Sequence, residues 1–102
     1  MTLAIYRITA GFPRSELYGL TSQLRRSGAS VAANLAEGCV RKGDAEFARF
    51  CYISMGSASE LEYHLLLAKD LDLIKLPEYR ELARRTTETK RMLAGLLKTL
   101  QV

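Results

Sequence analysis

The single histidine of this 102-residue chain, His64, follows Glu60 by one helical turn, a spacing that would offer a metal ion two ligands on one helix face. Di-metal sites in helix bundles need Glu-x-x-His motifs from two separate helices, and one histidine cannot supply them. A catalytic set of nucleophile, histidine and acid cannot be assembled reliably around one imidazole either. We therefore expect no catalysis, no cofactor and no metal, and interpret His64 as a histidine on a helix surface or in an interface.

The two cysteines, Cys39 and Cys51, lack the Cys-x-x-Cys spacing of redox and metal motifs, so we expect free thiols in a helical core. The basic segment 38–43 begins and ends with glycine but lacks the Gly-Lys-Ser/Thr ending of a Walker loop. No signal peptide precedes the cysteines, and no apolar run approaches the roughly 20 residues that span a bilayer. These features predict a cytoplasmic protein without a membrane segment.

Four helical segments must position these side chains, because glycine, proline and short polar connections interrupt an otherwise helical pattern. Neither sustained period-two alternation nor a hairpin turn signal is present, which argues against strands. Helices joined by short connections pack as antiparallel neighbours. We therefore predict one all-α domain over residues 1–102, an antiparallel up-down four-helix bundle with a short first helix.

The helix boundaries follow from local signals at each connection. Residues 11–13 (Gly-Phe-Pro) end the first helix, and Gly38 is the expected C-terminal cap of the second. Ser15 and Thr21 are alternative N-caps for that helix, and Asp44 is the expected N-cap of the third. The predicted helices are Met1 to about Ala10, a second helix after the irregular segment Ser15–Gly19 up to about Gly38, about Ala45 to Leu71, and Pro77 to the C-terminus.

The third segment is apolar around most of its circumference, as in helices that are buried on more than one side. Its main stripe predicts a bundle core, and two further rows lie beside it. One small bundle cannot cover all of this surface, so we expect self-association. The main stripe contains Phe47, Phe50, Cys51, Ser54, Ala58, Leu61, Leu65 and Ala68, and the further rows contain Ala48, Tyr52, Met55, Ser59, Tyr63 and Leu66, and Ile53, Leu67 and Leu71.

The second helix has an apolar stripe, a polar row and a face of small residues, each at helical spacing. The small face would allow another helix to approach closely. Buried polar groups need hydrogen-bond partners, so we interpret the row as a structural network with Arg26 and Glu37 in one charge-compensated set; a ligand-facing row is the alternative. The polar row is Gln23, Arg26, Ser30, Asn34 and Glu37, and the small face is Gly28, Ala29, Ala32, Ala33 and Ala36.

Basic residues form the one sizeable functional surface that the sequence predicts. The formal charge of +4 favours anionic partners weakly, since this sign is common in soluble domains. Arrays of this kind bind phosphate backbones through counterion release, without reading bases. An ordinary solvated face is the alternative, because Glu78, Glu81 and Glu88 share the last helix. The candidate nucleic-acid-binding residues are Arg14, Arg25, Arg26, Arg41, Lys42, Arg80, Arg84, Arg91 and Lys98.

Longer motifs follow one another along nearly the whole chain. Residues 12–26 have the pattern Phe-Pro-x-x-Glu-x-Tyr-Gly-Leu-Thr-x-Gln-Leu-Arg-Arg, and residues 30–38 the pattern Ser-Val-x-x-Asn-Leu-Ala-Glu-Gly. Residues 50–62 and 91–98 continue the match. In these motifs the chain resembles the bacterial four helix bundle protein family, also called 23S rRNA intervening-sequence proteins. The fold is also similar to the accessory variability protein of diversity-generating retroelements, a basic pentameric barrel that binds nucleic acid and a reverse transcriptase.

The resemblance implies a four-helix bundle that assembles as a homopentamer, with nucleic-acid binding suspected and no catalytic role. It also adds Glu16 and Glu60 to the residues of the structural polar network. Two departures from the family pattern stand out: about a dozen residues fewer before Tyr6, which would leave core uncovered or filled by another subunit, and Ala32 where proline is frequent. We expect a non-catalytic oligomer that binds RNA or DNA; a protein–protein adaptor that docks a partner such as a reverse transcriptase is the alternative.

Overall fold

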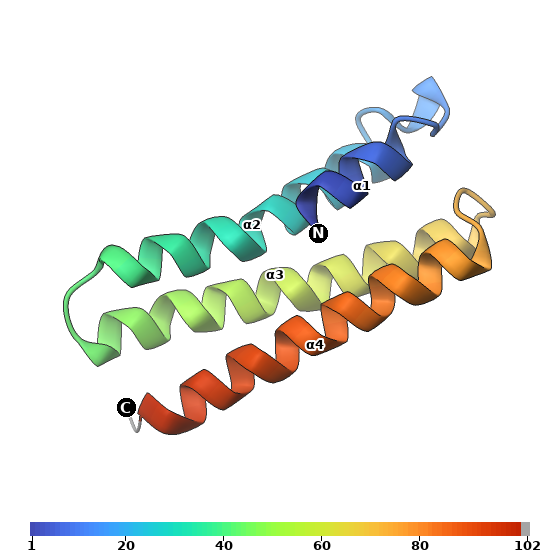
Figure 1. Cartoon of the computed structure of the whole chain (residues 1–102). Coiled ribbons are helices and arrows are strands. Elements are labelled where there is room, and N and C mark those ends of the chain that lie inside the picture. Colours follow the sequence, from blue (N-terminus) through green and yellow to red (C-terminus); the bar gives the residue numbers. More distant parts are fainter. Residues whose placement is uncertain (101–102) are drawn as a thin grey trace.

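The computed structural model describes residues 1–100, which form helices α1 (Thr2–Thr9), α2 (Leu20–Val40), α3 (Asp44–Asp70) and α4 (Leu76–Leu100) and a 3₁₀ turn, η1 (Arg14–Glu16). Consecutive helices run antiparallel, α3 lies between α2 and α4, and α1 lies along the first half of α2 (Figure 1). No strand occurs in these residues. The predicted all-α bundle with a short first helix is confirmed; residues 101 and 102 of the predicted domain lie outside the described part.

The predicted boundaries of α1 and α3 and the predicted start of α4 are correct to within one residue, whereas both predicted caps of α2 are wrong. The predicted end of α4, at the C-terminus, lies outside the described residues. The residue before α2 is Gly19 rather than Ser15 or Thr21, and no side chain caps the helix. At its other end, α2 continues past Gly38 to Val40. Gly43, with a φ of 88°, occupies the N-cap position of α3 that we predicted for Asp44. Glycine suits this position because a left-handed φ strains other residues.

Gly38 lies inside α2 because the helix passes very close to α3 there. A Cβ atom on Gly38 would lie 2.9 Å from the Cβ of Phe50 and 3.1 Å from Cδ1 of Phe47. Contacts under 3.0 Å are not tolerated without a shift, and the Cβ of Phe50 is held by the α3 backbone. The glycine that resembles a helix cap in the sequence is therefore a packing residue.

The core is built around α3, whose predicted main stripe is buried apart from the half-buried Phe47. Ile5 of α1, Leu24 of α2, Leu61 and Leu65 of α3, and Leu82 of α4 belong to one hydrophobic cluster. Each such side chain contributes about 1.5–3 kcal/mol when fully removed from water. This cluster fixes α1 against the start of α2, and it thereby determines where the side chains of these two segments meet.

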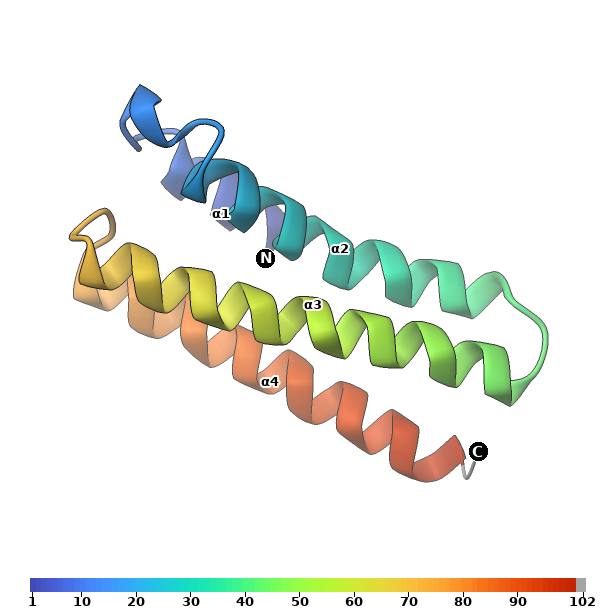
Figure 2. The same cartoon turned by 180° about the vertical axis from the view of Figure 1, so that it is seen from behind.

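Two apolar surfaces remain uncovered. Figure 2 shows that α1 accompanies only the first half of α2. A Cβ on Gly28 would lie 2.6 Å from Cδ1 of Ile5, so α1 packs closely there, but Ala32, Ala33 and Ala36 further along the small face are exposed. The second surface, which we call the uncovered α3 face, consists of the exposed residues Tyr52, Ile53, Tyr63 and Leu66. Self-association through these surfaces stays a prediction. No helix in residues 1–100 has the length and apolar composition needed to cross a membrane.

Candidate nucleic-acid interface

Several of the candidate basic residues are neutralised by neighbouring carboxylates. Arg26 forms an ion pair with Glu60, and Nη2 of Arg41 lies 2.5 Å from Oε1 of Glu37. Arg84 contacts Glu81 at 2.7 Å and Glu88 at 2.6 Å, and Arg85 shares Glu81. Hydrogen bonds from Arg84 and Arg85 lower the pKa of Glu81, which keeps this carboxylate ionised. The middle of the predicted α4 surface therefore offers little uncompensated positive charge.

The other candidate cations differ in how closely they are grouped. Arg80, Arg91 and Lys98 are exposed on α4 and form no ion pair within residues 1–100, but they extend over about 27 Å of helix at 1.5 Å per residue. Lys42 is likewise exposed, in the α2–α3 connection. Arg14 and Arg25 lie at the other end of α2 and line the same hollow. Among the candidates that form no ion pair within residues 1–100, these two are the ones that the structure brings together.

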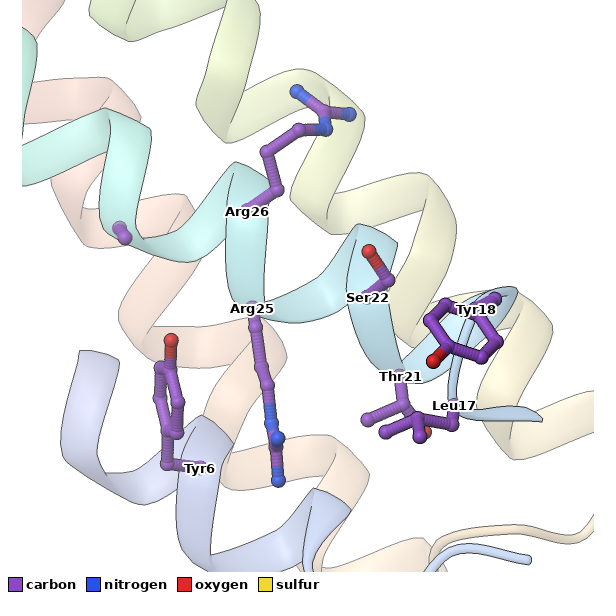
Figure 3. Close-up of a pocket in the computed structure, with 8 residues that line it drawn as sticks. Tyr6, Leu17, Tyr18, Thr21, Ser22, Arg25 and Arg26 are labelled. Atoms are coloured by element: carbon purple, nitrogen blue, oxygen red, sulfur yellow. The ribbon is translucent and has the colours of Figure 1, made fainter. Parts of the chain in front are cut away.

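An open groove lies between α1, η1 and the first turns of α2. Two adjoining hollows, of about 450 and 260 Å³, share Leu17, Thr21 and Arg25 as lining residues. The larger hollow is also lined by Tyr6, Tyr18, Ser22, Arg26 and Ala29, and is shown in Figure 3. The smaller is also lined by Thr9, Ala10, Phe12, Pro13 and Arg14. We call the two together the α1–α2 groove.

Arg25 is held in the α1–α2 groove by two residues of α1. Its Nε donates to Oγ1 of Thr9 at 2.9 Å, and its guanidinium carbon lies 4.6 Å from the centre of the Tyr6 ring. Figure 3 shows the side chain extending alongside that ring. Thr9 is itself fixed, because its hydroxyl donates to the Ile5 carbonyl at 2.7 Å. Within residues 1–100, neither terminal NH₂ group of Arg25 has a hydrogen-bond partner, and no carboxylate pairs with it.

The remaining lining residues give the groove one neutral, partly aromatic wall. Tyr18 is 92% exposed although it is a large aromatic residue. Thr21 is only 3% exposed, and its buried hydroxyl has no hydrogen-bond partner in the described chain. Arg26 extends away from the others toward α3 (Figure 3), where it binds Glu60 and the Gln23 side chain. The usable positive charge of the groove is therefore that of Arg25 and Arg14.

The predicted structural network is divided into separate groups, contrary to our expectation that Arg26 and Glu37 share one set. They are eleven positions apart, about 16.5 Å along a helix, which is too far for direct charge compensation. Arg26 joins Gln23, Glu60 and, through Glu60, His64. Glu37 pairs with Arg41. Near the middle of α2, the hydroxyl of Ser30 lies 2.8 Å from that of Ser57 and accepts a hydrogen bond from Asn34.

Glu16, the last predicted member of the network, lies apart from the others. It belongs to η1, and its Oε1 lies 3.5 Å from the position that a Cβ on Gly19 would occupy. The place of this residue in the network stays a prediction. It is the carboxylate next to the start of α2, so we assign no anion site to that helix end.

His64 lies at the α2–α3 contact, where Nε2 is 3.4 Å from Oε2 of Glu60 and Nδ1 is buried without a partner. Burial lowers its pKa, and the charge of Arg26 lowers it further. Glu60 alone would favour the imidazolium, but Arg26 already neutralises that carboxylate. Residues 1–100 contain no cluster of three His, Cys, Asp or Glu side chains suited to a metal. Of the two cysteines, Cys51 is buried as predicted, whereas Cys39 is exposed.

Tyr6, Thr9 and Tyr18 are not among the predicted site residues. Thr9 and Arg25 are 16 residues apart in sequence, and the turn that brings them together contains no periodic pattern. The available signal is Tyr18, an aromatic residue that lies between Arg14 and Arg25 in the sequence and outside any regular apolar stripe. Aromatic residues interleaved with basic ones are typical of nucleic-acid-binding surfaces.

Comparison with known proteins agrees with the fold. A solved structure of a protein of unknown function from the S23 ribosomal protein family of Bacteroides thetaiotaomicron matches with a TM-score of 0.84 at 25% sequence identity, over 95% of this chain and 88% of that chain. No curated protein matches. The family model described as 23S rRNA-intervening sequence protein matches residues 1–95. The chain therefore belongs to the 23S rRNA-intervening sequence protein family.

Proposed function

We propose that this protein is a non-catalytic nucleic-acid-binding protein that contacts RNA phosphates through Arg14 and Arg25 of the α1–α2 groove. The observation behind this proposal is the state of Arg25: Thr9 and Tyr6 fix its guanidinium, while its terminal NH₂ groups have no protein partner within residues 1–100. A guanidinium offers paired N–H donors that match two phosphate oxygens. The family name, which refers to an rRNA intervening sequence, supports RNA as the ligand.

The pairing of charges makes this groove a better phosphate site than the middle of α4. A phosphate at Arg84 would have to compete with Glu81 and Glu88, which already occupy that guanidinium. At Arg25 no carboxylate has to be displaced. Each phosphate contact releases condensed counterions, so the affinity of such a site falls steeply with salt concentration. Exposed Arg80, Arg91, Lys98 and Lys42 would add weaker, longer-range attraction.

We also propose that the protein acts as a homo-oligomer, for which the resemblance to its family favours a pentamer. The uncovered α3 face and the exposed alanines of α2 support this. The first surface carries large, partly aromatic side chains, and the second carries only small ones. Such unlike surfaces on one chain favour a head-to-tail contact, which closes into a ring when the rotation allows it. Assembly would place several grooves and their positive charges on one particle.

Fluorescence anisotropy with a structured RNA and a duplex DNA, over a series of salt concentrations, tests the proposal. The protein sample should first have its mass defined by light scattering. We expect log affinity to fall linearly with log salt concentration. Absence of binding to both ligands at low salt by the assembled protein would contradict the proposed function.

A protein–protein adaptor is the second candidate, and the uncovered α3 face is the observation that favours it. Exposed Tyr52 and Tyr63 are typical of residues at protein interfaces. An acidic partner, for example a reverse transcriptase with an acidic surface, would suit the net positive charge of this chain. A salt-sensitive complex with such a purified protein, without RNA or DNA binding, would favour this candidate.

A further inference from the structure

We propose that the α1–α2 groove takes single-stranded RNA, with one unstacked base on Tyr18 and the neighbouring phosphate on Arg25 and Arg14. This inference rests on the proposed function and specifies the form of nucleic acid that the groove accepts. The two hollows of the groove have different linings, and this difference corresponds to the two parts of a nucleotide.

The larger hollow has the size and the walls of a base-binding site. Its volume of about 450 Å³ lies within the range of about 300–1,000 Å³ of small-ligand pockets, so one nucleotide fits. Tyr18 is 92% exposed, which leaves its ring free for a flat apolar partner, while Leu17 next to it is also exposed. The described bundle leaves almost all of the Tyr18 side chain uncovered. Every base has a π-face, so a tyrosine platform accepts bases without regard to sequence.

The smaller hollow shares Arg25 with the larger one and is also lined by Arg14. Arg25 lines both hollows, so its terminal NH₂ groups are available to the phosphate of a nucleotide whose base enters the larger one. Thr21 also lines both hollows, and its buried hydroxyl has no hydrogen-bond partner within residues 1–100.

Single-stranded RNA suits this arrangement better than a duplex. In a duplex, the bases are paired and stacked on each other, so their faces are not available to the Tyr18 ring. A duplex could contact the phosphate-binding arginines, but it would gain nothing from Tyr18. The groove therefore predicts a preference for unpaired nucleotides and a contribution from the tyrosine ring, neither of which follows from phosphate contacts alone.

The test is fluorescence anisotropy at one low salt concentration with a 12-nucleotide RNA, the same RNA as a duplex, and the same RNA with abasic sites. The proteins are wild type, Tyr18→Leu and Tyr18→Phe. Because Tyr18 is almost fully exposed, neither substitution should affect folding. We expect the single strand to bind more tightly than the duplex, and Tyr18→Leu to weaken single-strand binding by about 5–150-fold, the usual cost of losing one stacked base. Tyr18→Phe should bind as the wild type does, and the abasic RNA should bind the wild type as weakly as intact RNA binds the leucine variant.

Equal binding of single strand and duplex, with no effect of Tyr18→Leu, would overturn the base-stacking site. It would leave the proposed function intact if the binding remained salt-dependent. If the wild-type protein binds none of the RNAs, both proposals are overturned. If Tyr18→Leu leaves the binding of single strands unchanged, the preference for single strands comes from another part of the protein. That result would also overturn this site.

Discussion

The Nε atom of Arg25 donates a 2.9 Å hydrogen bond to the hydroxyl of Thr9, which joins α2 to α1 at the candidate site. Replacing Thr9 with valine keeps the size of this buried side chain but removes the acceptor. Arg25 would then have to be ordered when RNA binds, at an entropic cost of about 1 kcal/mol, so we expect about fivefold weaker RNA binding. Anisotropy at fixed salt measures the change.

Thr9→Ser is the matched control, because serine retains the hydroxyl. We expect its RNA affinity to be close to that of the wild type. If Thr9→Val binds RNA as tightly as the wild type while remaining folded, then Thr9 does not position Arg25 for binding.

A second prediction concerns Gly38, which allows close contact between α2 and α3. Gly38→Ala would place a methyl group 2.9 Å from the Cβ of Phe50, and the helices would have to separate. We expect the free energy of unfolding to fall by about 1–3 kcal/mol, as in other overpacked cores. Urea denaturation at a fixed protein concentration measures the change, since oligomerisation affects apparent stability.

Gly95→Ala provides the control for this prediction. Gly95 is an exposed glycine within α4, and a Cβ there would meet no atom within 4 Å. Alanine favours helix over glycine, so this variant should be about 0.5–1 kcal/mol more stable. Equal effects of the two substitutions would show that Gly38 is not required for packing.

The third prediction is a pH dependence of stability from His64. Burial and Arg26 lower its pKa in the folded protein, so between the two pKa values the unfolded chain binds more protons than the folded chain. The contribution of His64 is therefore complete above the unfolded pKa of about 6.5 and is lost as the pH falls below it. We expect the urea concentration at the unfolding midpoint to decrease as the pH is lowered from about 7 to about 5.5.

His64→Gln removes the titrating group and should reduce the slope of stability against pH in this window. Glu60 and Arg26, the charged groups next to the imidazole, remain in place in this variant. A wild type and a variant with the same slope would show that His64 does not titrate differently in the folded and unfolded states.

The fourth prediction separates the two cysteines. Cys39 is exposed, whereas Cys51 is buried, and burial together with the nearby Cys39 raises the pKa of the Cys51 thiol. Because the thiolate is the reactive form, a thiol reagent should label Cys39 rapidly and Cys51 only when the protein opens. Cys39→Ser should abolish the rapid phase and leave the slow one. Two rapid phases in the wild type would show that the core around Cys51 is open to the reagent.

Sequence periodicity was sufficient to predict the helices and the buried stripe of α3, because burial of one helix face leaves a repeating pattern. It predicted the ends of α2 wrongly for a physical reason. Glycine is the residue type expected at a helix cap, but Gly38 is needed for another reason. Its lack of a side chain leaves room for Phe50, a residue of another helix. Whether a glycine is needed for a backbone angle or for a close contact depends on tertiary packing, which local signals do not record.

The candidate site could be predicted only in part. Arg14 and Arg25 were identified from their charge, but so was Arg84, which Glu81 and Glu88 neutralise. Ion pairs within one helix can be anticipated from i, i+3 and i, i+4 spacing. The link from Arg25 to Thr9 and Tyr6 cannot, because it depends on how an irregular turn folds α1 back along α2.

The salt dependence of single-stranded RNA binding tests the central claim, that the α1–α2 groove supplies the phosphate contacts. The measurement compares wild type with Arg14→Gln/Arg25→Gln and with Arg84→Gln/Arg85→Gln, which remove the same formal charge. We predict that the first pair reduces the slope of log affinity against log salt by about 1.4, or about 0.7 for each lost contact, and that the second leaves it nearly unchanged. Equal slopes for wild type and Arg14→Gln/Arg25→Gln, or a larger reduction in Arg84→Gln/Arg85→Gln, would contradict the account.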